Sequence, residues 1–170
     1  YQTAYLKANY PAEFIAASMA LDSSSTDKLA IFRQQCQRDS IAILPPNINF
    51  SASNFFVEPA RNGSEGGIRY ALGALKNVGS EAMAMLVAER EANGVFLDLP
   101  DLLLRVPKEA CNRRQLENLI RAGALDSLHS NRRELLENID TLLAYAETMQ
   151  RDAQSSQESL FGGSDALDTT

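Results

Sequence analysis

The chain has 170 residues, 45% of them hydrophobic, and a formal net charge of −6 at pH 7. This length allows one domain or two small ones, and this apolar fraction is normal for a globular core. No apolar run is long enough to span a bilayer, we expect no signal peptide, and the overall acidity argues against a generic nucleic-acid binder.

The distribution of charge is more informative than its sum. Residues 105–133 contain seven bases and three acids, a net charge of +4, whereas residues 134–170 contain eight acids and one base, a net charge of −7. A basic middle therefore precedes an acidic C-terminal part. Cys36 and Cys111 lie far apart without metal-ligand spacing, which indicates buried or idle thiols in a reducing compartment rather than a disulfide.

The first part of the chain is predicted to form helices followed by a small sheet. Because the chain starts at Tyr1 rather than at Met, inside a predicted helix, we expect a fragment of a longer protein. The predicted helices span residues 1–21, with a break at Asn9-Tyr10-Pro11, and residues 28–39, with a cap at Ser25 or Thr26. Short apolar runs predict strands at residues 41–44, 54–58 and 68–72.

The stretch LGALKNVGSEAMAMLVAERE, residues 72–91, organises the chain. It predicts a short helix, a tight turn over residues 76–79 and a longer amphipathic helix. Asn77 tolerates a positive φ angle, and Gly79 allows the backbone to come close to another group. Ser80 is placed to cap the second helix.

A turn of this kind leaves free backbone N–H groups at the start of a helix, which is a site for a phosphate. The pattern resembles the helix-hairpin-helix element of DNA-binding proteins, with Val78 at an apolar position and Gly79 as the second hairpin glycine. Asn77 stands where the first glycine is usual, and Lys76 where proline is common. Residues 119–128 look like a degraded second hairpin. The alternative is an ordinary corner between packed helices that is closed by a glycine.

The remaining sequence predicts two more long helices and a polar tail. A helix over residues 108–122 carries Arg113 and Arg114 largely on its outer side, and a long amphipathic helix follows over residues 131–150. The composition of residues 151–170 cannot bury enough surface to fold alone.

One apolar pair, Leu160 and Phe161, interrupts the polar tail. Large hydrophobic side chains in a disordered segment often serve as docking anchors, and Gln157 is near enough for the same peptide to add an amide. The alternative is that both side chains fold back onto the preceding helix.

Five segments together resemble the alpha subunit of bacterial replicative DNA polymerase III, a C-family polymerase. They follow the order and approximate spacing of that family: YQTAYLKANYPAEFIAASM at 1–19, ILPPNIN at 43–49, GIRYALGALKNVG at 67–79, RRQLENLIRAGALDSL at 113–128 and QESLFG at 157–162. The resemblance covers nearly the whole chain and implies an internal piece, from the end of the fingers through the clamp-binding domain.

The resemblance also implies two binding sites. In the first, the hairpin region contacts the backbone of duplex DNA without reading sequence, and the expected residues are Lys76, Asn77, Val78, Gly79, Ser80, Arg113 and Arg114. In the second, an extended peptide docks into the ring-shaped sliding clamp. Gln157 is the hydrogen-bonding residue, Leu160 and Phe161 form the hydrophobic plug, and Ser159 belongs to the variable middle.

The catalytic part of such a polymerase is missing from this sequence. A polymerase needs clustered aspartates that hold two Mg²⁺ ions, which we expect only in the parent protein. Asp98 and Asp101 are the nearest pair and look like helix caps. His129 has no evident metal or nucleophile partner and is expected in a surface or capping role. We therefore expect neither a cofactor nor polymerase activity in this piece alone, and the remainder of the polymerase core as a partner.

The expected fold is mainly α with a small β patch, and the expected location is cytoplasmic. The expected parts are the helical end of the fingers at 1–40, a β-containing connection at 41–71, a helix-hairpin-helix clamp-binding domain at 72–150 and a flexible tail at 151–170. One alternative function is a protein-interaction scaffold without DNA binding. Another is a fragment of a DNA-repair nuclease, which would require a cluster of carboxylates or histidines that the sequence does not offer.

Overall fold

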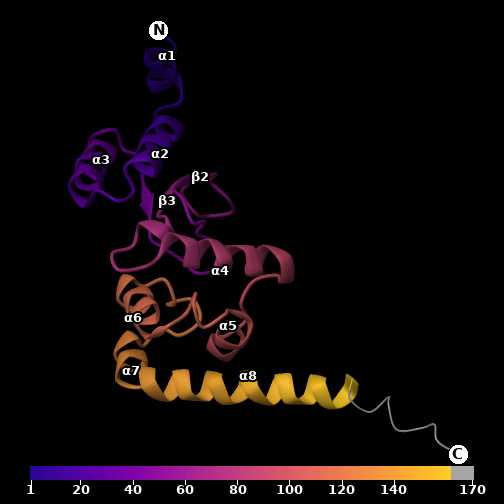
Figure 1. The fold of residues 1–170 in the computed structure, drawn as a ribbon. Coiled ribbons are helices and arrows are strands. Elements are labelled where there is room, and N and C mark those ends of the chain that lie inside the picture. The colour runs from indigo at the N-terminus through magenta and orange to yellow at the C-terminus, as the bar shows by residue number, and fades with distance from the viewer. Residues whose placement is uncertain (162–170) are drawn as a thin grey trace, which may run out of the picture.

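The structure is a computed structural model that describes residues 1–161. Its elements are stacked in layers between helix α1 at one end and helix α8 at the other (Figure 1). The predicted fold, mainly helical with a small β patch, is confirmed. Within residues 1–161, no helix combines the length and the apolar character that crossing a membrane requires.

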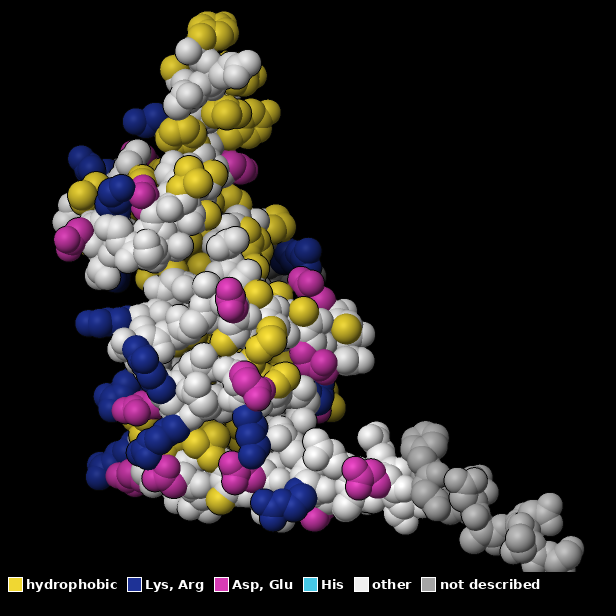
Figure 2. Space-filling view, in the orientation of Figure 1, with side chains coloured by type: hydrophobic (Ala, Val, Ile, Leu, Met, Phe, Trp, Pro, Cys, Tyr) yellow, Lys and Arg dark blue, Asp and Glu magenta, His cyan; other side chains and the backbone are white. Residues whose placement is uncertain are grey.

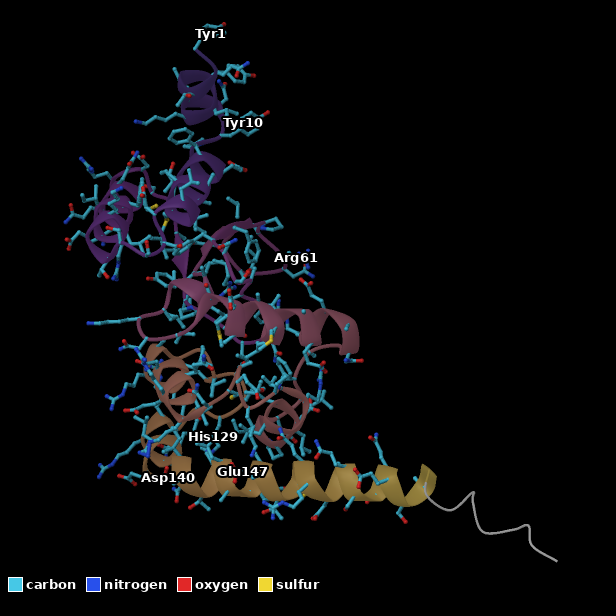
Figure 3. The ribbon with its side chains drawn as sticks, in the orientation of Figure 1. Tyr1, Tyr10, Arg61, His129, Asp140 and Glu147 are labelled. Atoms are coloured by element: carbon cyan, nitrogen blue, oxygen red, sulfur yellow. The ribbon has the colours of Figure 1, made fainter. Side chains whose placement is uncertain are left out.

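Three helices form the N-terminal layer: α1 (Gln2–Asn9), α2 (Pro11–Leu21) and α3 (Thr26–Arg38). The predicted break lies at Tyr10, and Pro11 occupies the first turn of α2, where its missing N–H costs no hydrogen bond. Ser25 caps α3, because its hydroxyl oxygen accepts a hydrogen bond from the N–H of Lys28 at 3.4 Å. Helix α1 buries none of its residues and projects away from the body with Tyr1 and Tyr10 (Figure 3).

A three-stranded sheet lies below these helices, with strands β1 (Ile43–Leu44), β2 (Phe56–Glu58) and β3 (Gly67–Arg69). Strand β3 is central and fully buried, parallel to β1 and antiparallel to β2. Ile68 of β3 pairs with Ile43 on one side and with Val57 on the other. Because β3 is buried, the sheet joins α2 and α3 in one apolar core that includes Met19, Cys36 and Ile68.

A partly buried ion pair links strands β2 and β3 of this sheet. The guanidinium of Arg69 binds both carboxylate oxygens of Glu58, at 2.7 and 2.9 Å, and donates to the carbonyl of Pro45 at 2.9 Å. The hydrogen bond from Arg69 holds the pKa of the Glu58 carboxyl below its ordinary value near 4.5. A carboxyl group whose pKa is lowered by folding stabilises the fold above its unfolded pKa and loses this contribution as the pH falls.

We therefore expect the free energy of unfolding to decrease between about pH 5 and pH 3, partly through Glu58. The variant Glu58→Gln should be less stable at pH 7 and should lose less stability on acidification than the wild type. Urea unfolding at several pH values measures both effects. The control Glu65→Gln removes an exposed acid of the same segment, and an equal change in acid sensitivity in both variants would contradict the role of the ion pair.

The second core holds the C-terminal half together. It is formed by a 3₁₀ helix and five α-helices: η1 (Leu72–Ala74), α4 (Ser80–Asn93), α5 (Leu99–Arg105), α6 (Arg113–Ala122), α7 (Arg132–Glu137) and α8 (Ile139–Phe161). Leu72, Met83 and Leu119 lie in this core with no exposed surface. Cys111 belongs to this core as well, and burial raises the pKa of its thiol to about 12. Cys36 and Cys111 are both buried free thiols, as predicted.

Three predicted helix boundaries differ in the structure. Helix α6 begins at Arg113 instead of Lys108, because residues 107–111 form turns and the side chain of Asn112 caps the helix by accepting from the N–H of Gln115 at 3.0 Å. The long helix predicted from residue 131 is divided at Asn138, which ends α7 and whose side chain donates to the carbonyl of Glu134 at 2.9 Å.

The third difference concerns the tail. The structure continues α8 to Phe161, so the segment 151–161, predicted to be flexible, is helical. The segment is exposed and has no core to join, but it consists largely of good helix formers and contains no Gly or Pro. Residues 162–170, the rest of the predicted flexible tail, lie outside the described residues.

Candidate nucleic-acid interface

The turn between η1 and α4 has the geometry that the sequence predicts. Asn77 adopts a left-handed conformation with a φ angle of 62°. Val78 points inward and is only 8% exposed, whereas Lys76, Gly79 and Ser80 are exposed. One apolar anchor therefore holds a turn whose other residues face solvent. The first element is a single 3₁₀ turn rather than the short helix that the sequence predicts.

The start of α4 is not capped by any side chain, and the predicted cap by Ser80 is wrong. Gly79 occupies the N-cap position and Ser80 is already the first helical residue, so the hydroxyl of Ser80 is not placed to cap. The first N–H group with a partner inside the helix is that of Met83, which donates to the carbonyl of Gly79 at 3.0 Å. The preceding N–H groups have no partner inside the helix and lie at its positive end.

Helix α6 brings a second cation to this turn. Arg114, in the first turn of α6, donates from Nη2 to the side-chain oxygen of Asn77 at 3.0 Å. Within residues 1–161, neither Arg114 nor Lys76 takes part in an ion pair. Arg113 points elsewhere, because its guanidinium binds the carboxylate of Asp140 at 2.8 Å at the start of α8 (Figure 3). The structure thus unites six of the seven predicted residues and assigns Arg113 to a salt bridge.

A glycine at position 79 is explained by the packing of α6. A β-carbon at Gly79 would lie 3.3 Å from the amide end of the Gln115 side chain. Gln115 is 9% exposed, and its amide is held by donation to the carbonyls of Glu109 and Ala110, at 3.1 and 2.7 Å. The group that approaches Gly79 is therefore a buried glutamine of this chain. Sequence reasoning missed Gln115, since a polar residue in a helix ordinarily indicates a solvent-facing position.

Hydrogen bonds also connect the two elements that flank the turn, η1 and α4, to the segment 47–53. Arg90 of α4 donates to the carbonyls of Ile48 and Ser51 at 2.9 and 2.7 Å. The N–H groups of Leu72 and Gly73 donate to the carbonyls of Ala52 and Ser53, both at 3.0 Å. These bonds fix η1 and α4 against the segment 47–53, so the turn between them is presented on a rigid support.

Further cations lie along the same edge of the molecule, over α6 and α7 (Figure 2). Three of them are held in local salt bridges: Arg121 with Glu117, Arg132 with Asp126 and Arg133 with Glu137. These pairs are exposed, and each acid offsets the charge of its partner. Among the cations of the turn, α6 and α7 in the described residues, Lys76 and Arg114, which flank the turn, have no acidic partner.

The predicted second hairpin is a helix end and a loop in the structure. Gly123 ends α6 in the left-handed conformation, with a φ angle of 81°, and α7 starts only at Arg132. His129 lies in the connecting segment (Figure 3), where its Nδ1 accepts from the N–H of Asn131 at 3.2 Å. His129 is therefore a partly exposed residue with a local hydrogen bond, and the cap of α7 is Asn131, whose side chain accepts from the N–H of Glu134 at 3.2 Å.

Asp98 and Asp101, the two aspartates that most resemble a catalytic pair, accept hydrogen bonds from backbone N–H groups instead. Asp98 accepts from the N–H of Asp101 at 2.8 Å and caps α5. Asp101 accepts from the N–H of Leu97 at 3.0 Å, which lowers its pKa, and also binds Arg105 at 3.0 Å. Both carboxylates are thus engaged and do not fit a two-metal site. In the part of the chain that the structure describes, no three His, Cys, Asp or Glu side chains form a group that could hold a metal ion.

The predicted clamp-binding residues lie on the last turns of α8. Gln157, Ser159 and Leu160 are exposed, and Leu160 is 81% exposed. The segment is helical here, whereas the resemblance implied an extended peptide. The alternative in which Leu160 folds back onto the preceding helix does not hold, because Leu160 stays in solvent at the far end of that helix. The Phe161 side chain lies outside the described part of the structure.

A model of the helix-hairpin-helix motif family matches residues 40–135, which is more than half of the chain. The chain belongs to this helix-hairpin-helix family. The matched residues extend from the segment before β1 into α7 and include the segment 47–53 that holds η1 and α4. The turn between η1 and α4 lies within the matched residues, with Asn77 and Lys76 at positions where glycine and proline are more common.

The helix-hairpin-helix chain also has close relatives in bacteria. It is 48% identical to the DNA polymerase III subunit alpha of Caulobacter vibrioides over 162 residues, and 46% identical to that of Neisseria meningitidis serogroup B over 161 residues. Each alignment covers 95% of this chain but only 14% of the relative. The alpha subunit of Rickettsia bellii is 38% identical over 94% of this chain, which is 15% of that relative. The resemblance drawn from the five segments is confirmed, and the chain spans about one seventh of the length of these relatives.

Proposed function

We propose that this chain is the part of a bacterial replicative DNA polymerase that grips the backbone of duplex DNA and tethers the polymerase to its sliding clamp. The hairpin turn is the observation that supports contact with the DNA backbone. It combines an uncapped helix start with two cations, Lys76 and Arg114, that have no acidic partner among the described residues.

Each component suits a phosphate better than a base. The N–H groups at the start of α4 carry partial positive charge and face solvent, which favours an anion. Lys76 adds a flexible point charge, and Arg114 adds a guanidinium held in place by Asn77. Contacts with phosphates fix position on a duplex but carry no sequence information, so the site binds DNA of any sequence.

The distribution of charge supports separate roles for two parts of the chain: DNA contact at the hairpin and clamp binding at the end of α8. The edge that carries the turn is basic, while residues 134–170 have a net charge of −7. The acidic helix α8 should avoid DNA, which leaves its end free for the clamp. A weak peptide contact, on the order of micromolar, is sufficient there, because a closed ring around DNA makes rebinding effectively intramolecular.

The relatives are DNA polymerase III alpha subunits, so the parent activity that we propose is DNA-directed DNA synthesis, with the remainder of the polymerase core as a partner. This part is proposed to be non-catalytic, because its nearest carboxylates, Asp98 and Asp101, cap a helix and bind Arg105. The catalytic Mg²⁺ ions would be held by other segments of the parent protein.

The variant Lys76→Glu tests the DNA-binding proposal. It should weaken binding to a fluorescein-labelled 20-base-pair duplex by about tenfold in low salt, since it replaces a phosphate contact with a repulsive charge. Fluorescence anisotropy over a series of salt concentrations should also give a salt dependence that is shallower by about one ion.

Lys7→Glu is the matched control. It causes the same change in net charge on an exposed residue of α1, at the opposite end of the molecule from α8 and far from the hairpin (Figure 1). Its affinity should stay close to that of the wild type. If Lys76→Glu bound DNA as well as Lys7→Glu, or if the wild type showed no salt-dependent affinity, the chain would be better described as a protein-interaction scaffold.

A further inference from the structure

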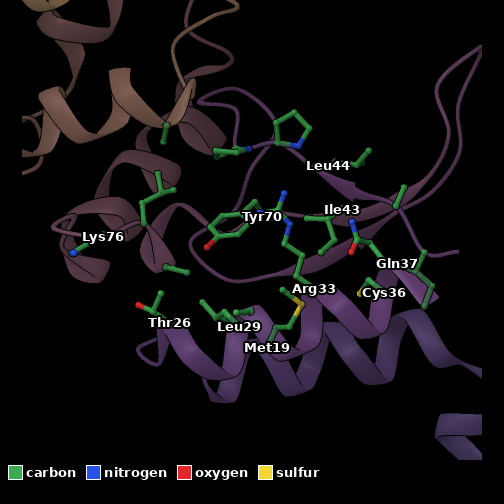
Figure 4. Close-up of a pocket in the computed structure, with 18 residues that line it drawn as sticks. Met19, Thr26, Leu29, Arg33, Cys36, Gln37, Ile43, Leu44, Tyr70 and Lys76 are labelled. Atoms are coloured by element: carbon green, nitrogen blue, oxygen red, sulfur yellow. The ribbon is translucent and has the colours of Figure 1, made fainter. Parts of the chain in front are cut away.

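A groove with a volume of about 760 Å³ lies between helix α3 and the segment that contains β1 (Figure 4). Helix α3 forms one wall, and the segment from Ile41 through β1 to Pro46 forms the other. Tyr70 and the residues that lead into the hairpin, Ala74 to Lys76, close one end. The groove therefore lies where the N-terminal layer meets the helix-hairpin-helix part, and it shares one residue, Lys76, with the hairpin turn.

The chemistry of the groove is apolar inside and basic at the rim. Its lining includes the half-buried side chains of Ile43 and Leu44 of β1, together with Leu29 and Cys36 of α3, which belong to the N-terminal core (Figure 4). Arg33 and Lys76 are exposed at its rim, and no acidic residue lines it. In residues 1–161 neither Arg33 nor Lys76 belongs to a salt bridge, so two charges at the rim are left without a counter-charge.

Two features argue against other kinds of occupant. An added β-strand would need a longer free edge, but β1 has only two residues and is followed by Pro45 and Pro46, which have no N–H to donate. Single-stranded nucleic acid is bound by stacking successive bases on aromatic side chains. The lining contains one aromatic residue, Tyr70, and its ring already packs against Phe55 with 4.9 Å between centroids.

We propose that this groove binds an acidic, amphipathic segment of a partner protein. The segment would place aliphatic or aromatic side chains between α3 and β1 and direct carboxylates toward Arg33 and Lys76. Burial of the apolar side chains supplies most of the affinity, and the charges at the rim supply orientation and selectivity for acidic partners. The proposal does not rest on DNA binding, because Arg33 and the apolar walls lie outside the hairpin.

The test is a selection from a random library of twelve-residue peptides displayed on phage, with the intact chain as the target. Peptides that combine acidic with large apolar residues should be enriched, and a synthetic copy of an enriched peptide should bind with a dissociation constant on the order of micromolar. Arg33→Glu should weaken that binding by about tenfold, because it places a repulsive charge at the rim. Arg38→Glu, an exposed arginine of the same helix that does not line the groove, should leave it within about twofold.

Amide chemical shifts of the isotope-labelled chain then locate the bound peptide. The proposal predicts changes concentrated at residues 29–37, at Ile43 and Leu44, and at Tyr70. Enrichment of peptides without acidic residues, or changes confined to another surface, would overturn it. It would also be overturned if an oligonucleotide of single-stranded DNA, and no acidic peptide, shifted the amides of the groove.

Discussion

Replacing Leu160 and Phe161 together with alanine should abolish detectable binding of this chain to a bacterial sliding clamp in a calorimetric titration. The proposed contact is a short peptide whose apolar pair fills a pocket, so almost all of its affinity depends on these side chains. A micromolar contact corresponds to about −8 kcal/mol. Loss of two large apolar side chains at about 1.5–3 kcal/mol each would weaken it by a factor of about 10² to 10⁴.

The matched control is Leu21→Ala, which removes a leucine that is 88% exposed at the end of α2. This variant should bind the clamp like the wild type. Equal binding by the control and the double variant would mean that the anchor lies elsewhere in the chain. Absence of binding by the wild type itself would leave the hairpin as the remaining functional proposal.

Gly73→Ala should lower the free energy of unfolding by about 2–3 kcal/mol, because it forces a methyl group into a backbone contact. An added β-carbon at Gly73 would lie 2.7 Å from the carbonyl oxygen of Ser53, and the N–H of Gly73 donates to that same oxygen. A carbonyl in the segment that supports the hairpin cannot turn aside as a flexible side chain can. The variant should therefore displace η1 as well as destabilise the fold, and DNA affinity should fall with it.

Chemical denaturation measures the loss of stability, and Gly63→Ala is the comparison. Gly63 has a φ angle of 87° with open space around it, so an alanine there costs only the backbone strain, about 1 kcal/mol. Gly63 lies in the loop before β3, outside the contact between η1 and the segment 47–53. If Gly73→Ala were no more destabilising than Gly63→Ala, the tight contact between η1 and the segment 47–53 would not be a determinant of the fold.

Much of this fold is predictable because its signals are local. The break at Tyr10-Pro11, the cap of α3 at Ser25, the positive φ angle of Asn77 and the cap at Asp98 depend on one or two residues and their immediate neighbours. The three short strands were also located to within a few residues, since apolar runs bounded by Pro and Gly have few other structures available. The conformation of the turn between η1 and α4 follows the same local logic.

The features that sequence reasoning missed depend on tertiary contacts or on the absence of a core. The contact of Gln115 with Gly79 and the hydrogen bond of Arg114 to Asn77 join residues that are far apart in the chain, and no sequence spacing reveals them. The helical course of residues 151–161 was missed for the opposite reason. The polar composition of this segment predicts a flexible tail, although helix propensity without Gly or Pro is sufficient to continue a helix that has already started.

We propose that the turn at residues 76–80 and the first turn of α4 hold the phosphates of duplex DNA. The most direct measurement is a titration of the isotope-labelled chain with a 20-base-pair duplex, followed through backbone amide resonances. We expect the largest shifts at Gly79, Ser80 and Glu81 and at Arg114, reversed by salt and absent in Lys76→Glu. Shifts confined to other surfaces, with unchanged resonances at the start of α4, would contradict the claim.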